Sequence, residues 1–191
     1  MGNDGGSIPS RDEMVRTKAA PRAKDDLKQA AKQDAWSYCA LSRSQLTAPL
    51  VSDGHGKLYN KESILTYLLE PSEFAGDASK QMAHVTSMKD VVVLQLSKSG
   101  DKYICEVTRR DMDGATPFVY LTPCGHALAK AALSHSDDRV CPVCDMAFDE
   151  RDIIPINPEE ADTARLQSRL EALAAEGLTH SGAPMRKKKR K

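Results

Sequence analysis

Four residues of metal-binding types stand close together in the second half of the chain. Segment 124–126 reads Cys-Gly-His and segment 141–144 reads Cys-Pro-Val-Cys. Zinc prefers thiolate and imidazole ligands in a tetrahedron, and short chelating segments bring such ligands together. The glycine between the first two ligands permits a tight backbone turn. The spacing therefore predicts one zinc ion bound by Cys124, His126, Cys141 and Cys144.

This ligand set predicts a structural ion. Three thiolates and one imidazole fill a tetrahedral shell and leave no position for a reacting water. Such a site contributes on the order of 10 kcal/mol to folding. The alternative is a redox pair at Cys141 and Cys144, but such a pair normally opens a helix after a strand in a βαβ unit, and the flanking pattern does not favour one.

The same ligand order is typical of half a RING domain, which holds two zinc ions. Cys105 is placed to begin the second ligand set, but Thr108 stands at its partner position and Ala129 at the next ligand position. We therefore predict that hydrogen bonds and apolar packing replace the second ion, as in U-box proteins. Cys39 is followed by Ser42 in the same spacing, so the preceding segment is predicted to be a zinc-free U-box-like module with a core thiol.

Short strands, turns and helices must position these groups. Turn residues between apolar segments indicate a hairpin over residues 50–59, and β-branched residues indicate a strand over 91–96. In the second module we predict strands at 103–104, 118–121 and 153–154 and a helix over 127–133. Loop, hairpin and helix follow one another in both modules, which suggests a weak internal repeat.

The predicted fold class is α+β, with a small zinc-binding RING-like module preceded by a zinc-free U-box-like module, a C-terminal helix and a disordered basic tail. The predicted segments are an extended N-terminal segment (1–33), the U-box-like module (34–98), the RING-like module (99–157), the helix (158–177) and the tail (178–191).

Charge is unevenly distributed along the chain. Basic and acidic residues balance at 27 each, but six of the basic residues lie in the last seven positions, so the rest carries 21 basic against 27 acidic residues. An acidic body disfavours strong direct nucleic-acid binding. The basic cluster is typical of a nuclear import signal, formed here by Arg186, Lys187, Lys188, Lys189, Arg190 and Lys191. No apolar segment is long enough to predict a membrane span.

The other cysteines and the histidines outside the site are predicted to be structural. Five cysteines without a secretory signal argue against a disulfide framework. We expect His55 and His135 to be exposed, His84 to be packed and His180 to lie in the disordered tail.

Several segments in the same order resemble the replication termination factor 2 family of nuclear RING-like proteins. They are residues 1–9, 56–61, 84–91, 124–126 and 152–158. The resemblance implies a nuclear protein that supports fork pausing or termination at site-specific barriers. It also implies a link to pre-mRNA splicing and protein partners in the replisome or spliceosome.

Two functions stay open at the level of sequence. The first, which we favour, is a non-catalytic docking module; the second is a ubiquitin or SUMO ligase, which would hold a conjugating enzyme in a reactive geometry. Asp145 follows the last ligand, where ligases often carry a basic residue, and this favours the first function. Under either function, the predicted partner contacts are Leu41, Val107, Pro142 and Val143.

Overall fold

The computed structural model describes residues 30–74, 82–134 and 139–185. The chain divides into two units, residues 1–32 and 33–191, and the elements below belong to the second, except that the helix over residues 30–37 begins in the first. The predicted N-terminal segment lies almost wholly outside the described residues.

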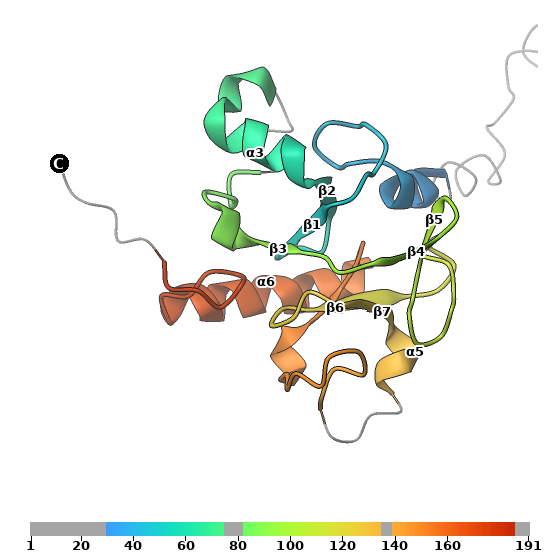
Figure 1. Cartoon of the computed structure of the whole chain (residues 1–191). Helices are drawn as coiled ribbons and strands as arrows, with labels where there is room; N and C mark the ends of the chain where they lie inside the picture. The colour runs from blue at the N-terminus through green and yellow to red at the C-terminus, as the bar shows by residue number, and fades with distance from the viewer. Residues whose placement is uncertain (1–29, 75–81, 135–138, 186–191) are drawn as a thin grey trace, which may run out of the picture. The chain divides into compact units, whose positions relative to one another are not determined.

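Two three-stranded antiparallel sheets of the same order form the frame of the second unit (Figure 1). In each sheet the first strand along the chain lies in the centre and pairs with the two that follow. The first sheet consists of β1 (Leu50–Asp53), β2 (Leu58–Asn60) and β3 (Val91–Val93), and the second of β6 (Phe118–Leu121), β7 (Ala127–Ala129) and β8 (Ile153–Pro155). A hairpin of β4 (Ser97–Ser99) and β5 (Lys102–Ile104) lies between them in sequence.

Helices follow the same positions in both sheets. A helix comes directly after the second strand, and a 3-10 turn with a capping box comes directly before the third. These pairs are α3 (Lys61–Leu69) with η2 (Met88–Asp90), and α5 (Lys130–Leu133) with η3 (Glu150–Asp152). The remaining helical elements are residues 30–37, η1 (Pro71–Phe74) and α6 (Glu160–Ala175).

Strand register shows that the two sheets are repeats of one plan. Leu50 pairs with Asn60 at the start of the first hairpin, and Phe118 pairs with Ala129 at the start of the second. The third strand then runs antiparallel to the central one over three residue pairs in both sheets. The internal repeat suggested by the sequence is confirmed at the level of backbone pairing.

The two repeats, one built around each sheet, hydrogen-bond to each other just beyond their third strands, β3 and β8. Beyond β3, the Gln95 N–H donates to the Gly125 carbonyl of the second repeat at 2.8 Å. Beyond β8, the Asn157 N–H donates to the Gly56 carbonyl of the first repeat, also at 2.8 Å. Both glycines have a left-handed backbone, with φ of 76° and 77°. Each repeat therefore donates one backbone hydrogen bond to the equivalent glycine carbonyl of the other, as expected for two repeats related by an approximate two-fold axis.

One continuous core joins both repeats, and α6 covers part of each. Leu166 and Leu173 are the buried residues of α6, while Leu170 lies against Gly54 in the turn between β1 and β2. The helix carries a polar outer face, as its sequence predicts. Within the described residues, no helix has the length and apolar character that crossing a bilayer requires.

One predicted element boundary is corrected. The predicted helix over 127–133 is a strand in its first three residues, because these pair with β6, and only Lys130–Leu133 is helical. The predicted module boundary at residues 98 and 99 falls inside β4. The α+β class holds, since the described chain mixes short strands and helices.

The start of the predicted tail is ordered, which corrects the prediction of disorder over 178–191. The His180 side chain is buried, with 4% of the residue exposed. Its Nε2 lies 2.7 Å from the Tyr120 hydroxyl and its Nδ1 lies 2.9 Å from Nη1 of Arg169. A buried aromatic partner and a helix side chain therefore hold this segment, while the last six residues lie outside the described part.

Candidate metal centre

Three turns of identical hydrogen bonding, here called knuckles, begin at Cys39, Cys105 and Cys141. In each, the cysteine N–H donates to the carbonyl five residues later, and the cysteine carbonyl accepts from the N–H four residues later, at 2.8–3.0 Å. The residue four positions after the cysteine has a positive φ in every case: Arg43 (56°), Arg109 (57°) and Asp145 (53°). The sequence indicated the third knuckle through its Cys-Pro-Val-Cys spacing, and the other two only through the same spacing from Cys39 to Ser42 and from Cys105 to Thr108.

The residue three positions after the first cysteine differs among the knuckles: it is Ser42 in the first, Thr108 in the second and Cys144 in the third. In the first two, the N–H of Ser42 and the N–H of Thr108 donate to the cysteine Sγ at 3.5 and 3.4 Å. Burial alone would raise the pKa of these two thiols, but such hydrogen bonds outweigh it and lower the pKa of each. In the third knuckle, Cys144 supplies a second thiol instead.

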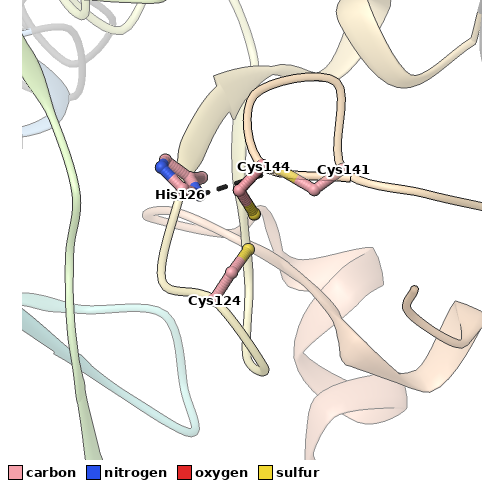
Figure 2. A group of neighbouring side chains, drawn as sticks. All are labelled: Cys124, His126, Cys141 and Cys144. Atoms are coloured by element: carbon pink, nitrogen blue, oxygen red, sulfur yellow. Dashed lines mark hydrogen bonds between the residues drawn. The ribbon is translucent and has the colours of Figure 1, made fainter. Parts of the chain in front are cut away.

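The four predicted ligands meet between the third knuckle and the turn that joins β6 to β7. One ligand atom from each of Cys124, His126, Cys141 and Cys144 lies within 4.8 Å of the others. Figure 2 shows the four side chains around a shared space. The Sγ of Cys141 lies 3.7 Å from Nδ1 of His126. This group can hold a metal ion.

The backbone fixes the turn that carries the first two of these residues. The Gly125 N–H donates to the Leu121 carbonyl at 2.7 Å, and the Leu121 N–H donates to the His126 carbonyl at 3.1 Å. Gln95 pairs with His126 in an isolated bridge from the other repeat. The ligand positions therefore depend on contacts that both repeats supply.

The electrostatics of the cluster favour a cation. Burial first, and then the neighbouring thiols of Cys141 and Cys144, raise the pKa of Cys124 to about 12. A divalent cation reverses this preference, because it stabilises coordinated thiolates. Three sulfurs and one nitrogen match the donor set of a closed tetrahedral site.

The predicted partner contacts lie in different environments. Leu41 is 6% exposed and packs in the core, so it offers no exposed contact surface in this structure. Val107 is 46% exposed at the second knuckle. Pro142 is exposed and Val143 is partly buried at the third. The basic cluster 186–191 lies outside the described residues.

A second group of metal-binding side chains was not predicted from the sequence. Single ligand atoms of Asp53, His55 and His84 lie within 4.8 Å of one another in the first repeat. The Asp-Gly-His spacing was visible in the sequence but indicates a turn equally well. Nothing in the sequence placed His84 beside that turn, because a helix and a long connection separate them.

Comparisons with known proteins agree with these features. The profile of the family described as Rtf2 RING-finger matches residues 1–191. The chain is 41% identical over 185 residues to splicing factor rtf2 of Schizosaccharomyces pombe, a match that covers 95% of this chain and 75% of that protein. It is 35% identical over 191 residues to replication termination factor 2 of Sus scrofa, covering 90% of this chain and 61% of that protein. The Homo sapiens protein of the same name is 34% identical over 191 residues, and 61% of its length is covered.

Proposed function

We propose, because this chain belongs to the Rtf2 RING-finger family, that it is a nuclear, non-catalytic docking module that supports replication fork pausing or termination and contributes to pre-mRNA splicing. The names of its relatives, replication termination factor 2 and splicing factor rtf2, support both roles. The observation that carries the docking role is the set of three rigid knuckles, of which two present exposed apolar side chains.

The metal in this proposal is one structural zinc ion. Cys124 and His126 would hold it from the β6–β7 turn, and Cys141 and Cys144 from the third knuckle. The ion's role is to fix the third knuckle, whose own loop contains few large apolar residues, against the second sheet. Four protein ligands leave no coordination position for a substrate, which supports a structural role.

The proposed partner contacts are Val107 and Pro142, with Val143 as packing support. Both exposed side chains stand on knuckles whose backbone is fixed by hydrogen bonds. A rigid apolar tip loses little conformational entropy when it binds a partner. The partners in this proposal are proteins of the replisome or the spliceosome, and residues Arg186–Lys191 direct the protein to the nucleus.

The experiment is quantitative affinity purification from nuclear extract with wild type, Val107→Asp and Leu69→Asp. Leu69 is a matched control because it is an apolar residue with 80% exposure on α3, outside the knuckles. We expect Val107→Asp to deplete replication or splicing components at least several-fold, and Leu69→Asp to retain them. Equal recovery with all three proteins would contradict the docking surface.

The same samples test the ligase alternative. Zinc-dependent ubiquitin or SUMO conjugation in a reconstituted reaction, lost in Val107→Asp, would replace the docking proposal with a ligase. We expect no such conjugation, because the acidic Asp145 occupies the position after the last ligand.

A further inference from the structure

The first repeat carries its own polar cluster where the second repeat carries the cysteine site. His55 directly precedes Gly56, as Cys124 directly precedes Gly125, and both glycines occupy the same left-handed position before the second strand. Asp53 ends the central strand β1, just as the last residue of β6 precedes the cysteine turn. The repeat therefore places two clusters of metal-binding side chains at equivalent turns.

Asp53 is the centre of this cluster. Its side chain is fully buried, and Oδ1 accepts from the N–H groups of His55 (3.1 Å) and Lys57 (2.9 Å). Oδ2 lies 3.1 Å from the Tyr59 hydroxyl, which donates to it, and 2.8 Å from Nε2 of His84. Burial would raise the pKa of Asp53, but the contact with His84 and the Lys57 N–H outweigh burial and lower it. Asp53 is thus an anion held rigidly in the interior.

The two histidines complete a set of three donor atoms. His55 Nδ1 lies 3.9 Å from Asp53 Oδ2, and this buried nitrogen has no hydrogen-bond partner within the described residues. The His55 and His84 rings meet edge to face, with centroids 4.5 Å apart. Both rings are partly exposed, with 34% and 29% of the side chain accessible, so solvent reaches the cluster.

We propose that Asp53, His55 and His84 form a second divalent metal site, with Zn²⁺ as the ion that suits its chemistry. Two imidazole nitrogens and one carboxylate oxygen are borderline ligands that zinc accepts. Asp53 contributes Oδ2, His55 contributes Nδ1 and His84 contributes Nε2. Coordination through Nε2 needs this nitrogen free of its proton, so a proton between Nε2 and Asp53 Oδ2 moves either to Nδ1 of the same ring or to solvent. Water completes the coordination shell on the accessible side.

This site is expected to differ from the cysteine site in its affinity for zinc and in the rate at which the bound ion exchanges. Three ligands without thiolate bind zinc more weakly than three thiolates and one imidazole, and an accessible shell exchanges faster. We therefore expect the second ion to leave on dialysis while the first stays. The inference is independent of the proposed partners, since it concerns only metal content.

The test is equilibrium dialysis of the full chain against a series of free Zn²⁺ concentrations, with zinc per chain measured by mass spectrometry. Wild type should bind one tightly held equivalent and then a second, weaker one. His55→Ala should lose the second equivalent only, because this change removes a ligand atom that makes no hydrogen bond here. Glu171→Ala, a change on the exposed face of α6, should bind as wild type.

A second variant separates metal binding from stability. In His84→Gln the amide can still donate to Asp53 Oδ2, so the zinc-free protein should melt as wild type does while the second equivalent is lost. Retention of two equivalents by both His55→Ala and His84→Gln would overturn the site. A wild type that never exceeds one equivalent would show that a proton alone joins Asp53 to His84, and would also overturn it.

Discussion

The two repeats reach nearly the same backbone by different chemistry. In the first repeat, the Asn60 side chain ties its knuckle to the sheet, accepting from the Thr47 N–H at 2.9 Å and donating to the Gln45 carbonyl at 2.9 Å. The register places Ala129 at the equivalent position of the second repeat, where no side-chain polar atom exists. The second repeat instead has a third knuckle with two thiols facing the β6–β7 turn.

The difference shows which features of this fold depend on side-chain chemistry. The knuckle geometry is the same at Cys39, Cys105 and Cys141, so it does not require a metal ion. What varies is the link between knuckle, turn and sheet, which is an amide network in one repeat and a cluster of metal-binding residues in the other. A link through one ion concentrates much stability in four side chains, whereas hydrogen bonds contribute about 1 kcal/mol each.

The largest expected effect is at the cysteine site. Cys141→Ser should lower the free energy of unfolding by more than about 4 kcal/mol, because it removes a metal ligand from a closed shell. Cys105→Ser should lower it by about 1–2 kcal/mol, since that buried thiol accepts only weak hydrogen bonds. Urea denaturation in zinc-containing buffer measures both values.

Chelation provides the control for this pair. A strong chelator should bring wild type to the stability of Cys141→Ser and leave Cys141→Ser almost unchanged. If wild type keeps its stability when its metal content is zero, the ion does not link the third knuckle to the sheet.

The next effect tests the reciprocal contact between repeats. A Cβ at Gly125 would collide with the Val93 carbonyl, and a Cβ at Gly56 would collide with the Pro155 carbonyl. Alanine at either glycine should destabilise by about 2–4 kcal/mol, from the left-handed backbone and the displaced strand together. Thermal melts of both variants check this, with Gly100→Ala as control because its φ of 61° is similar but its Cβ position is open.

Similar losses at Gly125 and Gly56 would support the two-fold relation, and both should exceed the loss at Gly100. A loss at Gly125 alone would mean that only the β3 extension holds the repeats together.

The sequence predicted the parts that depend on local pattern. Apolar and turn residues located β1, β2, β3 and β6, and the Cys-His spacing located the cluster that can hold a metal. It could not predict that residues 127–129 form a strand, because alanine and leucine favour helix and only pairing with β6 decides otherwise. The Asp53 cluster and the buried His180 were also beyond reach, since each depends on a contact between segments far apart in sequence.

A smaller effect tests the amide network of the first repeat. Asn60→Ala should destabilise by about 2 kcal/mol, because it removes two part-buried side-chain hydrogen bonds to backbone groups. Thr66→Ala on α3 is the control, since its hydroxyl bonds the Glu62 carbonyl at the surface and should contribute little. Urea denaturation compares the two. A loss below about 0.5 kcal/mol for Asn60→Ala would show that the backbone hydrogen bonds of the first knuckle hold it without the amide.

The smallest effect concerns His180, which contacts the Tyr120 hydroxyl. By strand register, Tyr120 in the second repeat is equivalent to Ser52 in the first. Burial first, and then the Arg169 charge, lower the pKa of His180 to about 3, while Asp53 and Asp90 oppose the shift and His55 adds to it. The unfolded chain binds a proton near the ordinary pKa of about 6.5, so the stability is present above that pH and is lost as the pH falls toward 3.

Between pH 6.5 and 5.5 the loss should be about 1 kcal/mol, or less if residues 178–185 detach before the rest unfolds. Urea denaturation at several pH values measures it as the difference between wild type and His180→Gln, which cancels the other histidines. Because glutamine does not titrate, the variant should lack this part of the slope. Equal slopes in the two proteins would mean that His180 becomes protonated without leaving its site, and the contact with Tyr120 would then not limit stability in mild acid.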